Sequence, residues 1–391
     1  MKIEKETNTL KEIHQQPDMW IREYQLILKD KEKIKSFVSK HFFSKDTEII
    51  MTGAGSSSFV GNVLSMILPQ KSYNNFKTIP SSDLITHPHI FLQKNKKFVL
   101  ISFARSGNSP ESMGVLKIAN FLCENIFHII ITCNKDGELV KNANPDNTLL
   151  LILPPETNDK GLAMTSSFST MLLTMMLVLN IDNIEEQFQA IEAISMNTIK
   201  LLNSYETEIK KIVNKKFERA VFLGSGELKG IAQECHLKLQ ELTDGKIICK
   251  FDSFLGFRHG PKAVINDKTL LIYLFSDDEY VLQYEKDLVK QINENNHVVA
   301  QIAVFGNNLV NIKDVIFDLQ ILTGSSFNLT KEYSCIPYVL IGQLLGYYKS
   351  LYFGLNPDNP SISGNISRVV KGVTIYDNFN MMQQWGKQKI Y

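Results

Sequence analysis

Short apolar runs alternate with longer amphipathic stretches along most of this chain. In the first half, the apolar runs have the length of buried strands and are separated by segments with helical spacing: Glu48–Thr52, Phe98–Phe103, Phe127–Thr132 and Thr148–Leu153. Continuous apolar strands that alternate with helices are typical of a parallel sheet covered on both faces. The pattern therefore predicts an α/β fold. Residues 1–45 contain no such run and have helical spacing around Trp20 and Tyr24, which predicts a helical lead-in.

The same series of elements occurs twice. Four pairs of segments keep one register at an offset of 171 residues: Glu48–Gly55 with Arg219–Gly226, Lys97–Phe103 with Lys268–Leu274, Phe127–Cys133 with Val298–Val304, and Ser167–Ile181 with Tyr338–Tyr352. Self-similarity at a fixed offset is the signature of a repeated architecture. We therefore expect two tandem domains of the same topology, at residues 46–200 and 216–355, followed by a C-terminal tail over residues 356–391.

Composition excludes several classes of protein. Hydrophobic residues make up 44% and charged residues 21% of the 391 residues, as in ordinary folded proteins, so the chain is neither disordered nor collagen-like. With 42 basic and 41 acidic residues, the net charge of +1 gives no global field that would attract nucleic acid or an anionic membrane. We expect neither as a partner.

The cysteines and the apolar stretches bear on the compartment. Five scattered cysteines form no Cys-x-x-Cys pair, which argues against a disulfide framework or a cysteine zinc site. The charged N-terminus lacks the apolar region of a signal peptide. The longest apolar stretch, Met171–Ile181, is about half the length of a membrane span. We therefore expect a cytoplasmic protein.

Each repeat opens with a strand, a Gly-x-Gly turn and a helix, at Gly53–Ser58 and at Gly224–Gly226. Glycine lets the backbone turn sharply and approach a ligand, and a helix N-terminus offers free N–H groups. Three consecutive serines add hydroxyl groups in the first copy. A tight turn without any ligand explains the glycines equally well. The second copy, with Asp252 downstream, also fits the dinucleotide-binding turn of an oxidoreductase.

A second loop in the first repeat points more strongly to an anion. The strand Phe98–Phe103 runs into Ala104–Glu111, with the sequence ARSGNSPE. The hydroxyls of Ser106 and Ser109, together with amides at a helix start, can cradle a phosphate without a lysine. A helix cap by Ser109 alone is the simpler alternative. The equivalent segment of the second repeat, Phe275–Glu279, is acidic and would repel phosphate, so we expect only the first repeat to bind it.

The second repeat contains a different set of charged residues. The helix after Gly226 presents Glu234, Lys238 and Glu241 on one face, at spacings of i, i+4 and i+7. The segment Phe257–Pro261, with the sequence FRHGP, follows downstream. Taken alone, such a helix is ordinarily a solvated row of ion pairs.

Together these motifs resemble the SIS (sugar isomerase) family over residues 46–376. The resemblance implies two tandem SIS domains, each a three-layer α/β/α, flavodoxin-like unit with a five-stranded parallel sheet. Three groups of residues resemble the family's substrate-binding loops: Gly55, Ser56 and Ser57; then Ser106, Gly107, Asn108 and Ser109; and, in the loop that closes over the sugar, Leu162, Ala163 and Thr165.

The resemblance extends to the isomerase half of glucosamine-6-phosphate synthase. It implies that Glu241 is the proton-shuttling base, that Lys238 is a lysine of the catalytic site, and that His259 assists ring opening. The tail Arg368–Ile375 resembles one whose lysine, here Lys371, reaches the open-chain sugar. The resemblance also implies a phosphosugar substrate, no metal or redox cofactor, and a homodimer whose chains share the active site.

The strings SFARSGNSPES and PPETNDKGLAMTSS are most similar to a stand-alone branch of the family. That branch is described as galactosamine-6-phosphate deaminase or as tagatose-6-phosphate ketose/aldose isomerase. It implies conversion of galactosamine 6-phosphate to tagatose 6-phosphate plus ammonia, or aldose–ketose isomerisation alone. One departure is Ala104, which replaces the serine that usually opens the phosphate loop. A non-catalytic sugar-phosphate sensor is a further alternative, but it would have no use for Glu241, His259 and Lys371 together.

Overall fold

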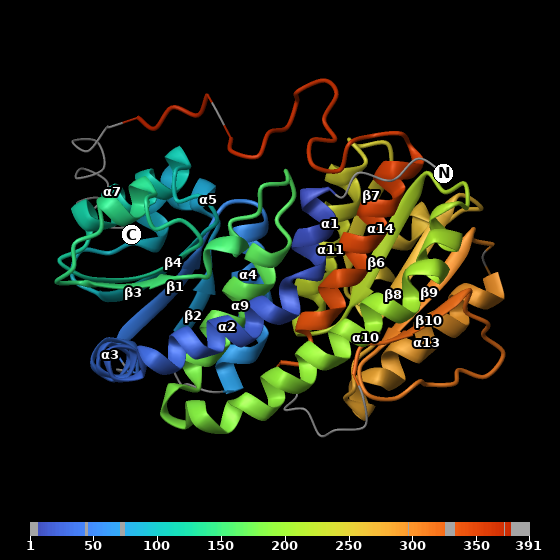
Figure 1. The fold of residues 1–391 in the computed structure, drawn as a ribbon, viewed down its shortest axis with the longest axis horizontal. Coiled ribbons are helices and arrows are strands. Elements are labelled where there is room, and N and C mark those ends of the chain that lie inside the picture. Colours follow the sequence, from blue (N-terminus) through green and yellow to red (C-terminus); the bar gives the residue numbers. More distant parts are fainter. Residues whose placement is uncertain are drawn as a thin grey trace. The chain divides into compact units, whose positions relative to one another are not determined.

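Two five-stranded parallel sheets form the framework of the protein in this computed structural model, which describes residues 7–43, 46–70, 75–295, 297–324, 333–370 and 372–376 (Figure 1). The first sheet has the strand order β2-β1-β3-β4-β5 and the second has the order β10-β9-β8-β6-β7. The strands are β1 (Thr47–Thr52), β2 (Asn75–Thr78), β3 (Lys97–Ala104), β4 (Asn125–Thr132), β5 (Thr148–Ile152), β6 (Arg219–Gly224), β7 (Ile248–Asp252), β8 (Thr269–Leu274), β9 (Ala300–Phe305) and β10 (Leu319–Leu322). Read in chain order, both sheets share one topology, and the predicted α/β fold with two five-stranded parallel sheets is confirmed.

Helices flank both sheets. They are α1 (Asn8–His14), α2 (Gln16–Lys29), α3 (Lys31–Phe37), α4 (Ser56–Ile67), α5 (Ser81–Thr86), α6 (Pro88–Phe91), α7 (Pro110–Leu122), α8 (Glu138–Lys141), α9 (Ser166–Leu179), α10 (Phe188–Val213), α11 (Glu227–Leu242), α12 (Phe254–Phe257), α13 (Glu279–Asn295) and α14 (Val339–Tyr352). In the part of the chain that is described, no single helix is long and apolar enough to cross a membrane. One pair, Ser166–Leu179 with Ile181–Val213, meets those criteria only when taken together, across a bend of 116°.

The repeat extends to the backbone of the turns that begin α4 and α11. Gly55 has φ 56° and ψ −129°, and its counterpart Gly226 has φ 58° and ψ −130°. A side chain is excluded at the first glycine of each turn as well. A Cβ atom on Gly53 would lie 2.6 Å from the carbonyl carbon of Ser57, and one on Gly224 would lie 2.4 Å from the carbonyl oxygen of Leu228. These glycines are therefore needed for the turn itself.

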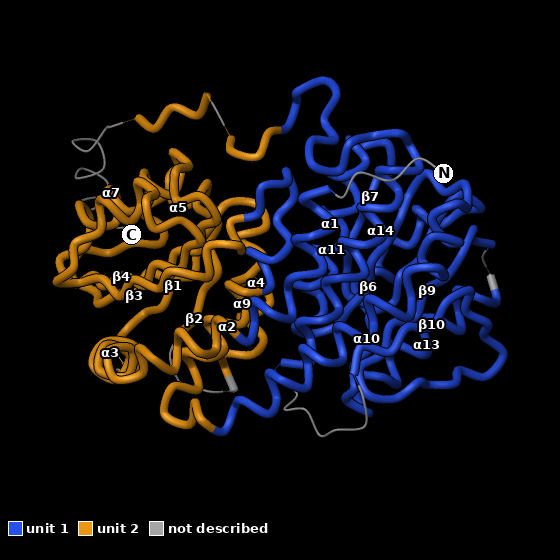
Figure 2. The backbone as a smooth tube through the Cα atoms, in the orientation of Figure 1, with its two compact units in different colours: residues 1–21, 159–169, 186–366 blue, residues 22–158, 170–185, 367–391 orange. Residues whose placement is uncertain are grey.

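The chain divides into two compact units (Figure 2). Unit 1 contains residues 1–21, 159–169 and 186–366, and therefore the second sheet. Unit 2 contains residues 22–158, 170–185 and 367–391, and therefore the first sheet. Each unit is assembled from three separate stretches of sequence.

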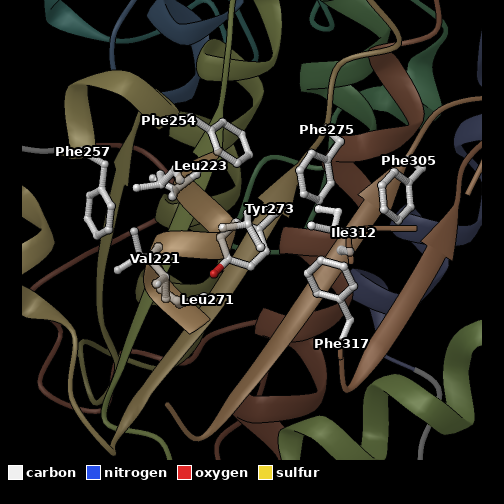
Figure 3. Packing of buried hydrophobic residues seen from close by; sticks show 14 residues of the cluster. Val221, Leu223, Phe254, Phe257, Leu271, Tyr273, Phe275, Phe305, Ile312 and Phe317 are labelled. Carbon is white, nitrogen blue, oxygen red and sulfur yellow. The ribbon is translucent and has the colours of Figure 1, made fainter. Parts of the chain in front are cut away.

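The core of unit 1 is rich in aromatic side chains. Figure 3 shows Phe254 and Phe257 of α12 among the side chains that cover one face of the second sheet, and both are fully buried. At the end of the sheet, the ring of Phe275, directly after β8, stacks on that of Phe305 in β9 with centroids 4.9 Å apart. Burial of the Phe254 and Phe257 rings fixes the short helix α12, and with it the start of the loop that carries His259.

Candidate active site

The two serine-rich loops of the first repeat follow neighbouring strands of the first sheet. β1 and β3 pair in parallel, with Thr52 opposite Ser102, and the strand order reverses between them. In open α/β sheets, ligands bind at such a reversal, beyond the carboxyl ends of the strands. The segment Gly55–Ser57 follows β1 and the Ser106–Ser109 loop follows β3, so the fold brings both to the end of the sheet where a ligand is expected.

The Ser106–Ser109 loop is fixed by backbone and amide hydrogen bonds. Gly107 has a positive φ of 63°, and its carbonyl accepts a hydrogen bond from the Leu139 amide at 2.9 Å. Asn108 Oδ1 accepts one from the Glu138 amide at 2.9 Å. Ser109 caps α7, since its hydroxyl accepts from the Ser112 amide at 3.2 Å. The cap that the sequence suggested as an alternative is therefore present.

Ser106 has no capping role and lies half-buried at the end of β3. Its hydroxyl oxygen accepts a hydrogen bond from the Asn108 amide at 3.3 Å. A hydroxyl that accepts one bond still has a proton to donate. Helix capping accounts for Ser109 but leaves Ser106 unexplained.

The serines at the start of α4 are buried. The amides of Ser57 and Ser58 already donate to the carbonyls of Ala54, at 3.2 Å, and of Gly55, at 2.9 Å. The Ser58 hydroxyl also donates to Gly55, at 2.9 Å. These two amides are therefore used within the turn, although the sequence suggested free N–H groups here.

Carboxylates lie near the corresponding end of the second sheet. Glu285 is fully buried and accepts a hydrogen bond from the Ser276 amide at 2.9 Å. Its burial raises its pKa to about 7. Asp277 accepts from the Asn307 amide at 3.2 Å, and Asp278 caps α13 through the Tyr280 amide at 2.9 Å. This acidic lining is unfavourable for a phosphate.

The charged residues of α11 form a buried array rather than a solvated row. Lys238 Nζ lies 3.1 Å from Glu234 Oε1 and also bonds the carboxylate of Glu241. The Lys238 and Glu234 side chains are 1% and 0% exposed, whereas that of Glu241 is 16% exposed. Burial by itself lowers the pKa of Lys238, but the two carboxylates outweigh it, so the pKa lies above its ordinary value. Lys238 is therefore a fixed positive charge beside a carboxylate that reaches solvent.

Close packing of α14 against α11 fixes this array. A Cβ atom on Gly342 would lie 2.4 Å from the Cα of Cys235, and one on Gly346 would lie 2.7 Å from the Lys238 carbonyl oxygen. Glycine at both positions lets the two helix backbones approach, so α14 sets the position of the α11 turn that carries Lys238.

His259 follows α12 in the same unit. Ser253 caps α12 by accepting a hydrogen bond from the Gly256 amide at 3.0 Å, and the His259 amide donates to Gly256 at 3.0 Å. Gly260 then turns the chain with a φ of 109°. The imidazole itself is exposed, in contrast to the buried array on α11.

The loop that the sequence associated with the sugar also belongs to unit 1. Leu162, Ala163 and Thr165 are buried, and the Thr165 hydroxyl donates to Asp159 at 3.1 Å. This bond gives Thr165 a role in holding the loop. Sequence reasoning did not single out Asp159, because it lies seven residues before the start of α9 and not at the capping position directly before the helix.

Lys371 lies outside the described residues, but neighbouring parts of the tail contact unit 2. Arg105, which sequence reasoning passed over, is buried and donates to the carbonyl of Arg368 at 2.6 Å. Arg368 in turn donates to Asn158 Oδ1 at 2.7 Å. A Cβ atom on Gly114 would lie 3.2 Å from Ile375, so the tail also packs on α7. A charged residue directly after an apolar strand was the available signal for Arg105.

Comparison with known proteins agrees with this fold. The SIS domain family matches residues 42–181. D-galactosamine-6-phosphate deaminase AgaS from Shewanella sp. (strain ANA-3) is 36% identical over 372 residues, which cover 94% of this chain and 91% of the relative. The chain belongs to the SIS-domain family of sugar-phosphate isomerases and deaminases.

Two solved structures are similar over nearly the whole chain. One, from Clostridium novyi, is described as a tagatose-6-phosphate ketose/aldose isomerase; it is 41% identical, with a TM-score of 0.91, and the match covers 95% of both chains. The tagatose-6-phosphate ketose/aldose isomerase from Escherichia coli is 33% identical, with a TM-score of 0.87, and the match covers 95% of this chain and 96% of the other. The resemblance to the SIS family that the motifs suggested is confirmed.

Proposed function

We propose that this protein converts galactosamine 6-phosphate to tagatose 6-phosphate and ammonia. The buried array on α11 is the observation that carries the proposal. Burying a lysine with two carboxylates costs desolvation free energy. A protein that only bound the sugar phosphate would not need such an arrangement, whereas an enzyme that moves protons would. The names of the relatives support an enzyme acting on this class of sugar phosphate.

In this proposal the substrate phosphate is anchored by hydroxyls of the first repeat. Ser57, Ser106 and Ser109 donate to phosphate oxygens, while Gly55, Ser56, Gly107 and Asn108 shape the two loops. The backbone around Ala163, with Leu162 and Thr165 beside it, lines the sugar. Because these serine hydroxyls are uncharged, phosphate binding here does not rely on a general excess of basic residues. The proposal is therefore compatible with the net charge of +1.

The chemistry begins with ring opening. His259, whose imidazole is exposed, assists as general acid and base and frees the C1 aldehyde. Glu241 then removes the proton from C2, which gives an enolamine with the hydroxyl on C1 and the amine on C2. Return of that proton to C1 gives a C2 imine. Water adds to the imine carbon, and ammonia leaves as the ketone forms.

Two lysines stabilise the charge that develops during proton transfer. Lys238 is buried and hydrogen-bonded to Glu241, so it holds the carboxylate and supplies a positive charge. Lys371 of the tail is assigned the same electrostatic role near C1 and C2. This assignment rests on the resemblance of the tail to that of related isomerases.

A second candidate is simple aldose–ketose isomerisation, which is favoured by the names of the two similar structures. The same residues perform the same proton transfer when a hydroxyl replaces the amine on C2. The intermediate is then an enediol, the product is a ketose, and no ammonia is released. The two activities therefore differ in substrate and product rather than in the catalytic groups.

The family resemblance further supports a homodimer whose partner chain completes the site. Sedimentation at several protein concentrations tests the assembly. A dimer at the concentrations used for assays is expected, and a monomer with full activity would contradict the shared site.

Replacing Glu241 by Gln tests the assigned base. The substitution preserves the shape of the side chain but removes its ability to take a proton, so turnover should fall about 10²-fold or more. Binding of galactosamine 6-phosphate, measured by calorimetry, should remain. Glu192 on the exposed surface of α10 offers a matched Glu→Gln control that should behave as the unmodified protein. Near-normal turnover of Glu241→Gln would remove Glu241 from this role.

A further inference from the structure

A buried carboxylate on the first helix holds the loop that precedes α9. Glu12 on α1 accepts a hydrogen bond from the Lys160 amide at 2.5 Å and one from the Gly161 amide at 3.2 Å. The Glu12 side chain is almost completely buried within unit 1. A Cβ atom on Gly161 would lie 2.7 Å from the Thr9 hydroxyl, so the loop backbone lies directly against α1. The contact joins segments 148 residues apart in sequence.

The C-terminal segment supports the same contact. The Leu162 amide donates to the carbonyl of Asp358 at 3.0 Å, so three successive loop amides have acceptors on distant segments of unit 1. The Asp358 carboxylate in turn accepts from the amide and the hydroxyl of Thr9, both at 2.8 Å. Helix α1 is therefore fixed at its start, and Glu12 is held against the loop.

The other end of the loop is held by a second buried carboxylate. Asp159 accepts hydrogen bonds from the amide of Thr165, at 2.8 Å, and from that of Ser167, at 3.0 Å. Asp159 thus fixes the start of α9, and Glu12 fixes the beginning of the loop. Ala163 lies between these two attachments.

This arrangement is electrostatically unfavourable, which indicates a purpose other than stability. Burial and the nearby Asp159 carboxylate raise the pKa of Glu12 to about 7, and Asp358 adds to the effect. These two carboxylates are the titratable side chains that act on Glu12 from the segments packed against it. An apolar side chain could fill the same space without bringing another charge beside Asp159, but it could not accept two backbone amides.

We propose that Glu12 is a positioning residue, which holds the Lys160–Leu162 backbone so that the Ala163 backbone is presented to the sugar. The proposal rests on the sugar-lining role assigned to this loop under the proposed function. Glu12 itself does not touch the substrate. Its ionised form accepts both amides, whereas protonation turns one of its oxygens into a donor and weakens one of the two bonds.

Replacing Glu12 by Gln tests the attachment without reference to activity. The amide side chain keeps one acceptor oxygen but places an NH₂ group where the second acceptor was. Hydrogen exchange at pH 8 should show the amides of Lys160 and Gly161 losing protection by about tenfold or more, the effect of one charge-assisted hydrogen bond. Glu12→Asp, which keeps the charge but withdraws it by one methylene, should give an intermediate loss. Glu32→Gln, on the exposed face of α3, is the matched control. Unchanged protection in both Glu12 variants would overturn the proposal.

Steady-state kinetics test the consequence for the sugar. At pH 8 the KM of Glu12→Gln for galactosamine 6-phosphate should exceed that of the unmodified protein by about tenfold, with kcat changed much less. Because the unmodified Glu12 becomes protonated as the pH falls through about 7, the ratio of the two KM values should shrink towards one at pH 6. A purely structural defect would keep the ratio constant.

These readouts separate the two hypotheses. If the unmodified protein does not act on galactosamine 6-phosphate, the proposed function fails, and hydrogen exchange still decides whether Glu12 holds the loop. If the unmodified protein is active but the KM ratio stays constant from pH 6 to pH 8, the positioning role fails alone. Should Glu12→Gln not fold, Glu12→Asp and the pH dependence of loop protection in the unmodified protein give the same decision.

Discussion

At the scale of single residues, Lys238 shows how burial changes the meaning of a common pattern. Its spacing from Glu234 and Glu241 is that of an ordinary surface ion pair, which contributes little to stability. In the structure the lysine is 1% exposed, and both carboxylates lie against it. Two negative charges with one positive charge leave a net negative group, of which only Glu241 reaches solvent. Of the three side chains, Glu241 is therefore the one that a substrate can reach, as its proposed role requires.

A different buried carboxylate should make stability depend on pH. Glu23 in unit 2 accepts a hydrogen bond from the Thr174 hydroxyl at 2.9 Å, and complete burial raises its pKa to about 8. The folded state therefore keeps a proton that the unfolded chain releases near its ordinary pKa of 4.5. The contribution of the protonated Glu23 carboxyl to the free energy of unfolding is therefore fully present below pH 4.5 and is lost as the pH rises through about 8.

Glu23→Gln should remove this dependence. Urea denaturation gives the free energy of unfolding of both proteins. The value for the variant minus that for the unmodified protein should rise by more than about 1.4 kcal/mol, the equivalent of one pKa unit, between pH 5 and pH 9. Parallel pH profiles for the two proteins would show that Glu23 is not the group responsible.

At the scale of elements, the contact between α11 and α14 connects packing to the site. Gly346→Ala places a Cβ atom 2.7 Å from the Lys238 carbonyl oxygen, and since backbone cannot give way locally, the helices must separate. We expect a loss of about 1–3 kcal/mol in the free energy of unfolding, as for other overpacked cores. We also expect a lower kcat with little change in KM, because the array on α11 moves.

Urea denaturation and initial rates at saturating substrate check this prediction. Ser204→Ala on the exposed surface of α10 is the control and should alter neither quantity. A Gly346→Ala variant that loses stability but keeps its full kcat would show that the position of α11 does not limit turnover.

The strands could be predicted from the sequence where both faces are buried, because every residue of such a strand is then apolar or nearly so. The runs Phe98–Phe103 and Phe127–Thr132 lie within β3 and β4, which have neighbours on both sides. The edge strands β2 and β7 were not apparent, because their residues are half-buried or exposed and show no such run. Each of these two strands has one neighbour and little apolar cover, so its sequence resembles that of a loop, whereas the edge strand β5 has an apolar run and could be predicted.

At the scale of the whole molecule, the repeat describes the architecture but not the chemistry. The two sheets share one topology, and the turns at Gly55 and Gly226 have nearly the same backbone angles. The first repeat has three serines in a row after β1, and Ser106 and Ser109 after β3. In the second repeat, Glu285 and Asp277 occupy the neighbourhood that hydroxyls occupy in the first.

The difference between the repeats predicts the stoichiometry of ligand binding. Calorimetric titration of the Glu241→Gln variant with galactosamine 6-phosphate should give one bound molecule per chain. Ser106→Ala should weaken this binding by about tenfold, the effect of one hydrogen bond to a charged group. Two molecules per chain would show that the acidic loop of the second repeat also accepts a phosphate.

The remaining parts of the candidate site could not be predicted for a physical reason. Glu12 contacts Lys160, and Arg105 contacts Arg368, across separations of 148 and 263 residues. Periodicity and local motifs carry information about neighbouring residues only, so neither contact leaves a trace in them. The serine loops and the α11 face were accessible because each is a local pattern. Whether these side chains are buried or exposed, above all Lys238, could be seen only in the folded structure.

The most direct test of the proposed reaction is an assay of both products on galactosamine 6-phosphate. Ammonia is measured enzymatically while the ketose phosphate is measured in parallel, with glucosamine 6-phosphate and the matching aldose phosphates as comparison substrates. We expect ammonia and tagatose 6-phosphate in equal amounts from galactosamine 6-phosphate. Ammonia from neither amino sugar, with no ketose from the aldose phosphates, would contradict it.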